Sequence, residues 1–175
     1  MADSSGLRTA DFDALFDAYK DYVYSVAFHL CRDRDAAEDI TQVVFIKLWR
    51  NTSPFRGESE FRTWLYRVVT NSFLDHRRRN RKWIFQDPPA DEAASGFTPH
   101  QALEQQEAAE SVRKALGTLS PNLRLPLVLR YIAGLSYEEI AVVLGTTRGT
   151  VASSINRGHA RLARKLSHLK NAGSR

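Results

Sequence analysis

The polar residues between positions 148 and 164 have types and a spacing that favour contact with the edges of DNA bases. At 100° per residue, one face of a helix over this segment carries Gly149, Ser153, Asn156, Arg157 and Arg164. Serine, asparagine and arginine side chains hydrogen-bond base edges in the major groove, and Arg157 has the geometry for a bidentate pair with guanine. The alternative interpretation is a helical hairpin with an exposed basic face.

The residues just before this segment predict a shorter helix and a tight turn. Ser136 and Glu139 have the spacing of a capping box, in which each side chain binds the other's backbone N–H. Gly145 suits the left-handed position that ends a helix, and Thr147 can cap the next one. We therefore predict a helix-turn-helix, the arrangement that places a helix in the major groove.

Side chains for bond-making or bond-breaking chemistry are few. The sequence has no phosphate-binding loop, no paired Cys/His zinc spacing and no nucleophile motif. His29 and Cys31 form the only close thiol–imidazole pair, and on a mostly apolar helix such residues usually belong to the core. We expect no enzyme, no metal and no cofactor, and a redox role for Cys31 stays open.

Residues 55–67 alternate aromatic and arginine side chains, which can stack on unpaired bases and hold the backbone beside them. Phe61 and Trp64 also fit an apolar stripe, so core packing is their expected role. The remaining candidates for contact with nucleic acid, including polar and basic residues that follow this segment, are Phe55, Arg56, Tyr66, Asn71, Arg77 and Arg78.

The helix expected from about residue 34 to residue 49 has two different sides. Its predicted inward side holds Ala36, Ile40, Val43, Val44 and Leu48. Outside that stripe lie Asp39, Gln42, Phe45 and Trp49. Exposed large apolar side chains favour a protein contact, with packing against a neighbouring helix as the alternative.

Helical periodicity recurs along the chain, and no strand pattern is found. We predict an all-α fold of two small helical domains, over residues 10–83 and 105–170, with the helix-turn-helix in the second. Residues 84–104 include the stretch DPPADE at 87–92 and Ser95-Gly96, and they predict a flexible acidic linker. Residues 83–100 as a free chain span roughly 25 Å, which lets the two domains engage separate sites.

Composition and charge narrow the function classes. The chain has 175 residues, 43% of them hydrophobic and 26% charged, with a formal net charge of +5. Basic residues gather in two blocks, at 71–85 and at 111–175, with an acidic stretch between them, which favours a polyanionic partner. The sequence holds no apolar run of about 18 residues, no secretory signal pattern and a single cysteine, so we expect a cytoplasmic protein without a membrane helix.

Three motifs together resemble one family. They are AEDITQVVFIKLWR at 37–50, FRGESEFRTWLYR at 55–67, and GLSYEEIA at 134–141 followed by GTV at 149–151. In this order and around a linker, they resemble the extracytoplasmic-function group of bacterial RNA polymerase sigma factors. The similarity covers roughly residues 10–83 and 105–168.

The resemblance implies roles for residues in both domains. Docking on core RNA polymerase would involve Asp39, Gln42, Val43, Phe45 and Trp49, although the family often has glutamate where Val43 stands. The minus-ten promoter element would be contacted by Arg56, Tyr66, Asn71, Asp75, Arg77 and Arg78. The minus-thirty-five element would be contacted by Arg148, Ser153, Ser154, Asn156, Arg157 and Arg161.

The resemblance also implies promoter DNA and an anti-sigma factor as partners. Ala152 and Ser154 stand where the family often has basic residues, which implies a weaker grip or a different sequence preference. The alternative function is a free-standing helix-turn-helix regulator that binds an operator as a dimer. Such a regulator would not need the docking residues of the first domain.

Overall fold

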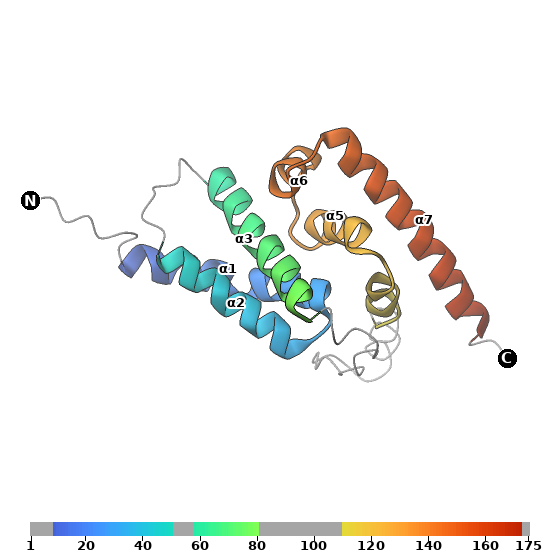
Figure 1. Cartoon of the computed structure of the whole chain (residues 1–175), viewed down its shortest axis with the longest axis horizontal. Helices are drawn as coiled ribbons and strands as arrows, with labels where there is room; N and C mark the ends of the chain where they lie inside the picture. The colour runs from blue at the N-terminus through green and yellow to red at the C-terminus, as the bar shows by residue number, and fades with distance from the viewer. Residues whose placement is uncertain (1–8, 51–57, 81–109, 173–175) are drawn as a thin grey trace, which may run out of the picture.

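The computed structural model describes residues 9–50, 58–80 and 110–172, and these residues form helices joined by short turns, without a strand among them. The helices are α1 (Thr9–Cys31), α2 (Arg34–Trp49), α3 (Glu58–Arg79), α5 (Pro121–Tyr131), α6 (Tyr137–Leu144) and α7 (Arg148–Ala172), and residues 110–117 are helical too. Figure 1 shows α1 to α3 packed at one end and α7 at the other. This confirms the predicted all-α fold. No helix within the described ranges is long and apolar enough to cross a bilayer.

Helices α1, α2 and α3 form the first group. Arg32, in the left-handed region at φ 60°, turns the chain between α1 and α2. Asp33 then caps α2, its Oδ1 accepting a hydrogen bond from the Ala36 N–H at 2.8 Å, as the sequence predicts. The predicted inward residues of α2 are buried, with the exception of Val43, which stands on its exposed side.

Helices α5, α6 and α7 form the second group. Pro121 occupies the first turn of α5, where a missing N–H costs nothing. Pro126 lies inside the same helix, which continues to Tyr131 because the apolar residues around Pro126 are buried and hold the turn in place. Gly158 of α7 lies against α5: a Cβ there would stand 2.6 Å from Leu127 Cδ1. This explains the glycine inside a helix.

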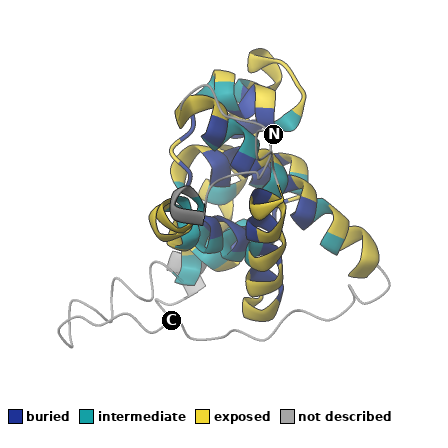
Figure 2. Cartoon of the chain, turned by 90° about the vertical axis from the view of Figure 1, so that its left-hand side faces the viewer, coloured by how far each residue is buried: buried dark blue, intermediate teal, exposed yellow. Residues whose placement is uncertain are grey.

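The two groups pack directly against each other. One continuous cluster of buried apolar side chains runs from Val23 and Leu65 in the first group to Leu129 and Ile140 in the second. Figure 2 shows buried residues on the sides of helices that face one another, with exposed residues on the outer sides. Because domains of this size bury little surface alone, the shared core adds stability that neither group has by itself.

Arg124 of α5 lies at the centre of the junction. Its Nη1 donates to the Leu30 carbonyl of α1 at 2.7 Å, and its Nη2 donates to the carbonyls of Gly117 and Leu119. Burial lowers the pKa of Arg124 to about 10, and the positive charges of Arg32 and Arg77 act in the same direction. Carbonyls at the ends of α1 and of the helical residues 110–117 thus bind the Arg124 guanidinium in place of a carboxylate. They can do so because the C-terminus of a helix carries a partial negative charge.

We predict that Arg124→Met lowers the free energy of unfolding by about 2 kcal/mol, because three partly buried carbonyls lose their donor. Urea unfolding followed by circular dichroism measures this. Arg164→Met, on the exposed side of α7, is the matched control and is expected to change stability by no more than about 0.5 kcal/mol. Equal unfolding midpoints for the two variants would show that the Arg124 contacts contribute nothing.

We predict that Cys31 is nearly inert at neutral pH. Burial raises the pKa of this thiol to about 12, with a further increase from the Asp33 carboxylate, so the reactive thiolate is scarce. Iodoacetamide should therefore modify the native chain at pH 7.5 far more slowly than the chain in urea. Ser167→Cys in a Cys31→Ala background places a thiol on an exposed turn of α7 and provides the fast reference. A native rate as fast as that reference would contradict the burial argument.

Candidate nucleic-acid interface

The helix-turn-helix is fixed by local hydrogen bonds that the sequence predicts. Ser136 Oγ accepts from the Glu139 N–H at 3.2 Å, and the Ser136 N–H donates to Glu139 Oε2 at 2.8 Å. Gly145 closes α6 in the left-handed region at φ 62°. Thr147 Oγ1 then accepts from the Thr150 N–H at 3.2 Å and caps α7. These contacts set the angle at which α7 leaves the turn.

The Glu139 carboxylate links this motif to α3. Partial burial by itself would raise the pKa of Glu139, but hydrogen bonds from the backbone and hydroxyl of Ser136 lower it. The nearby Arg62 guanidinium and a hydrogen bond with Ser59, both on α3, lower it further. The net result is a pKa below the usual value, so Glu139 is ionised at neutral pH and the cap stays intact.

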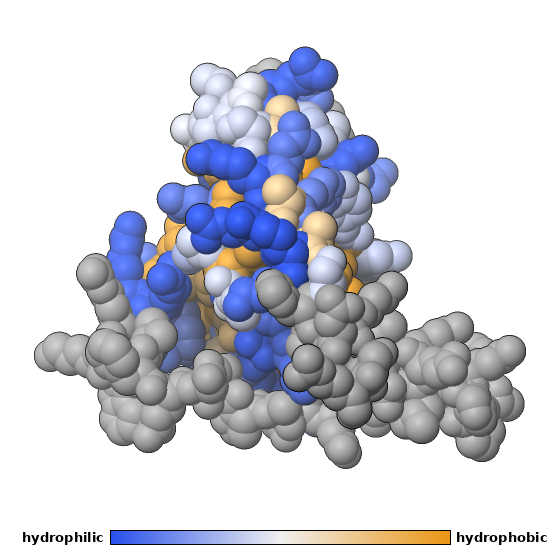
Figure 3. Space-filling view, turned by 90° about the vertical axis from the view of Figure 1, so that its right-hand side faces the viewer, coloured by the Kyte–Doolittle hydropathy of each residue, from blue (hydrophilic) through white to orange (hydrophobic). Residues whose placement is uncertain are grey.

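The outer face of α7 is polar and open. Val151 and Ile155 are buried against the core, whereas Ser153, Asn156 and Arg157 are exposed, as predicted. Among the described residues, Arg157 bonds within its own helix, through long hydrogen bonds to Ser153 O at 3.3 Å and Ser154 Oγ at 3.4 Å. Figure 3 shows mainly hydrophilic side chains over the end of the molecule where α7 lies.

Basic residues flank this outer face at both ends. Arg148 pairs with Glu138 at 2.6 Å, and both side chains are exposed. Arg161, Arg164 and Lys165 line a shallow hollow together with Thr118 and Leu119. Such exposed guanidinium and ammonium groups suit phosphates on either side of a groove.

Ser154 is a correction to the sequence prediction. Its side chain is 6% exposed, because it follows the buried side of α7 between Val151 and Ile155. It therefore does not stand on the outer face beside Ser153 and Asn156. Ser154 Oγ serves instead as an acceptor for the Arg157 side chain.

Helix α3 carries a second polar face. Asn71, Asp75 and Arg78 are exposed and stand within about 60° of one another around the helix, whereas Arg77 is exposed on another side. Asp75 and Arg78 form an ion pair at 3.4 Å. Arg56 and Phe55, which we predicted beside this face, lie outside the described residues.

Tyr66 is the second correction. Its side chain is 2% exposed within the core between the first helices, and burial raises the pKa of its hydroxyl to about 12. It cannot stack on a base in this arrangement. The apolar stripe of α3 includes Phe61, Leu65 and Val69, and Tyr66 extends that stripe on one side.

Helix α2 presents an exposed stripe on the outer side of the molecule. Asp39, Gln42 and Val43 belong to it, and Trp49 is 51% exposed, as predicted. Trp49 is held by an edge contact with Phe12 at 5.0 Å. Ile46 also belongs to the stripe, and the sequence prediction missed it although it lies three residues from both Val43 and Trp49.

Phe45 is the third correction to the sequence prediction. It was expected among the exposed docking residues, but it lies beneath the exposed stripe. Its side chain is 5% exposed and meets the ring of Phe16 at 4.7 Å and that of Phe12 at 6.5 Å. Helix α1 therefore covers the flank of α2 on which Phe45 lies. The exposed stripe consists of Asp39, Gln42, Val43, Ile46 and Trp49.

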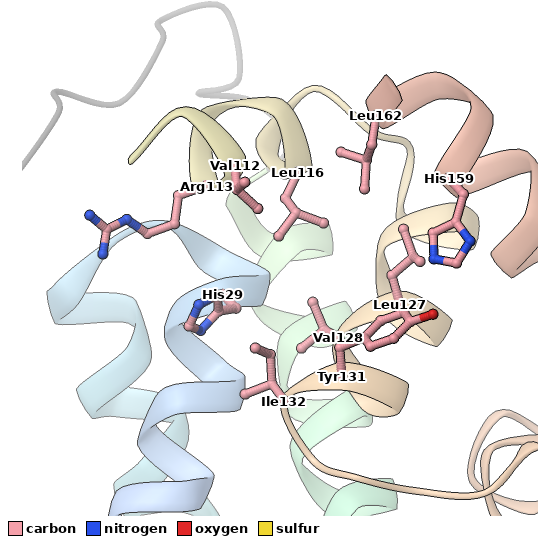
Figure 4. Close-up of a pocket in the computed structure, with 10 residues that line it drawn as sticks. All are labelled: His29, Val112, Arg113, Leu116, Leu127, Val128, Tyr131, Ile132, His159 and Leu162. Carbon is pink, nitrogen blue, oxygen red and sulfur yellow. The ribbon is translucent and has the colours of Figure 1, made fainter. Parts of the chain in front are cut away.

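An apolar cavity of about 440 Å³ opens where α1 meets the second group of helices. Figure 4 shows His29 on α1 and His159 on α7, at either end of a lining formed mostly by apolar side chains of α5 and residues 110–117. The described residues contain no cluster of His, Cys, Asp or Glu able to hold a metal ion.

Comparisons with known proteins identify the two helical groups. The Sigma-70 region 2 model matches residues 15–83, and the Sigma-70 region 4 model matches residues 109–162. The chain is 30% identical to the ECF RNA polymerase sigma factor SigW of Bacillus subtilis, with 93% of this chain and 94% of SigW covered. It is 32% identical to the ECF RNA polymerase sigma-E factor of Escherichia coli, covering 90% and 87%.

A third relative is longer. The chain is 36% identical to the ECF RNA polymerase sigma factor SigE of Mycolicibacterium smegmatis over 91% of this chain, but spans 64% of that protein. Among solved structures, the same fold is found in the sigma factor RpoE of Bartonella quintana, which was solved in complex with the anti-sigma factor NepR. The TM-score is 0.74 at 24% identity, and the match covers 91% of this chain and 98% of RpoE. The structure of CnrH in complex with the cytosolic domain of CnrY has a TM-score of 0.69 at 25% identity. The match covers 94% of this chain and 92% of CnrH.

The two family models lie on the two helical groups in chain order, and relatives at 30% identity or more are matched over most of their length. The chain therefore belongs to the extracytoplasmic-function group of RNA polymerase sigma factors, which direct transcription initiation and are not catalysts.

Proposed function

We propose that this chain docks on core RNA polymerase through the exposed stripe of α2, captures a melted promoter strand along α3 and reads duplex DNA with α7. The observation that carries the proposal is the α2 stripe itself, in which Val43, Ile46 and Trp49 stand in solvent beside Asp39 and Gln42. A row of apolar side chains with a polar edge suits a protein partner. A free-standing operator-binding regulator has no need for it.

The α3 face supports the second part of the proposal. Asn71 is exposed and can hydrogen-bond the edge of an unstacked base, and Arg78 lies about two turns further along the same side. Arg77 extends the positive charge around the helix. Unstacking a base costs a few kcal/mol, which base contacts and phosphate contacts at this face offset.

The α7 face supports the third part. Ser153, Asn156 and Arg157 project from a helix whose entry angle is fixed by the Thr147 cap and Gly145. The exposed Arg148 and Arg161 are placed to bind phosphates and so to fix the register on the duplex. The domains 10–83 and 105–170 then engage the minus-ten and minus-thirty-five elements, with 84–104 as the connection.

An anti-sigma factor completes the proposed set of partners. Both structural neighbours described above are held in complexes, RpoE with the anti-sigma factor NepR and CnrH with the cytosolic domain of CnrY. A partner of this kind would compete with polymerase for the chain. The proposed place of action is the cytoplasm, where polymerase and promoter DNA meet.

The proposal is tested by pull-down with core RNA polymerase followed by run-off transcription on a library of genomic promoters. We expect co-purification and initiation at promoters that share a two-part motif. Binding to DNA as a dimer, with no affinity for polymerase, would instead favour the free-standing regulator.

We predict that Asp39→Ala combined with Gln42→Ala lowers the affinity for core polymerase, because both side chains stand in the exposed stripe and removing them leaves no new cavity. Competition binding against the unmodified chain gives the ratio. Asp13→Ala with Asp17→Ala changes two exposed polar residues of α1 and is the matched control. Equal binding by the two double variants would refute docking through this stripe.

We predict that Arg157→Ala weakens recognition of the upstream element by about 1–3 kcal/mol and relaxes the preference at one base pair. Arg161→Ala should weaken binding equally for all sequences and reduce the salt dependence, because a phosphate contact carries no sequence information. Transcription by the holoenzyme from promoters with single upstream substitutions separates the two patterns. An unaltered base preference in Arg157→Ala would remove this residue from the reading face.

A further inference from the structure

Arg67 lies on the same face of α3 as the residues proposed to contact the melted strand. The positions 67, 71, 75 and 78 fall within about 80° around the helix and span roughly 17 Å along its axis. Arg67 is exposed, as are the other three residues. A guanidinium at the start of such a row suits a phosphate, because its planar fork matches phosphate oxygens.

In this structure the Arg67 side chain is hydrogen-bonded to the second group of helices. Its Nη2 donates to the Val142 carbonyl of α6 at 2.8 Å. Val142 lies in the last turn of α6, where its carbonyl accepts a long hydrogen bond of 3.4 Å from the capping Gly145 N–H and the helix dipole gives a partial negative charge. The end of α6 thus offers Arg67 a neutral substitute for a phosphate.

Other contacts hold α6 at this place. Arg62 Nη2 donates to the Ala133 carbonyl at 2.9 Å from a different side of α3, about 140° around the helix from Arg67. Arg62 also lies close enough to Glu139 to lower the pKa of that carboxyl group. At the other end of the junction, Arg124 joins α5 to the Leu30 carbonyl of α1.

We propose that Arg67 is a strand-phosphate-binding residue of α3, and that α6 withholds it from DNA while the two groups of helices are packed together. The inference rests on the strand-capturing role proposed above for α3. In the closed arrangement the chain restrains its own affinity for single-stranded DNA without any partner. Separation of the groups releases Arg67 to complete the row with Asn71 and Arg78.

A change of charge at Val142 tests the closure from the α6 side. The Val142 side chain is 53% exposed, so a longer side chain fits without disturbing the core. Val142→Arg places a like charge beside Arg67 and should raise the affinity of the full chain for a fluorescent minus-ten single strand about two- to fivefold, the range of an exposed charge pair. Val142→Glu should lower that affinity.

Matched controls separate closure from net charge. Ala163→Arg and Ala163→Glu make the same charge changes on α7, which lies on the far side of α5 and α6 from α3 (Figure 1). Distances between spin labels at Lys47→Cys and Arg164→Cys, in a Cys31→Ala background, report closure directly. We expect Val142→Arg to lengthen them and the Ala163 variants to leave them unchanged. Equal affinity shifts at Val142 and Ala163, with unchanged distances, would overturn the closure.

Arg62→Ala and Arg67→Ala distinguish a phosphate contact from a simple interdomain contact. Both remove one hydrogen bond to the second group, so both should lengthen the label distances. Arg62→Ala should raise the affinity for the single strand, because the α3 face stays complete. Arg67→Ala should lower it, and the slope of log affinity against log salt should decrease by about 0.7, the value for one phosphate of a single strand. A rise with Arg67→Ala equal to that with Arg62→Ala would refute the phosphate contact.

The failure of this inference is distinguishable from failure of the proposed function. If all Val142 variants bind the single strand with the same affinity, the proposed closure by α6 is refuted, whereas the proposed role of α3 in strand capture is unaffected. Absence of single-strand binding in every variant, including Val142→Arg, removes the role of α3 and with it the inference, whereas polymerase docking through α2 is tested separately.

Discussion

Hydrogen bonds from arginine side chains to backbone carbonyls hold the two helical groups together. Arg62, Arg67 and Arg124 each donate across the junction to a carbonyl at or near a helix end. A carbonyl balances a guanidinium through the partial charge of the helix terminus rather than a full negative charge. A junction built in this way stays intact as long as the shared apolar core is closed, and Arg67 and Arg124 are bonded across it to carbonyls rather than to carboxylates.

The use of carbonyls as acceptors matters because both groups are basic at the faces that we propose to contact nucleic acid. Arg77 and Arg78 stand at the end of α3, and Arg148, Arg157 and Arg161 stand along α7. Carboxylates at the junction would hold the groups together more firmly, but they would also repel DNA phosphates after separation. Carbonyls have no such effect, since water satisfies them once the arginines leave. On the proposed function, a junction whose arginines bond mainly to carbonyls suits a protein that must engage two promoter elements at once.

The sequence predicted the features that depend on a few neighbouring residues. The Asp33 cap, the Ser136–Glu139 capping box and the left-handed Gly145 each follow from side chains within one helical turn. The sequence did not predict which flank of a helix a neighbour covers. Periodicity gives the angle of Phe45, Tyr66 and Ser154 around their helices, but each lies beside the central stripe, and only the packed neighbour decides its burial. The hydrogen bonds from arginines to carbonyls across the junction could not be predicted for the same reason. Every helix end has free carbonyls that can accept such a bond, and only the packing of the helices decides which carbonyl lies near an arginine.

The closed arrangement treats the two proposed binding surfaces of the first group differently. The α2 stripe with Asp39, Gln42 and Trp49 faces solvent while the groups are packed, whereas Arg67 of α3 is already bonded to α6. On the proposed function, polymerase docks on α2 without first opening the junction, and the full strand-binding face of α3 forms only afterwards. Opening the junction costs free energy. A second contact, between helices α5 to α7 and another site on the polymerase, would supply that free energy. On the proposed function, this order places strand capture after polymerase binding, because the contact between Arg67 and α6 has to break first.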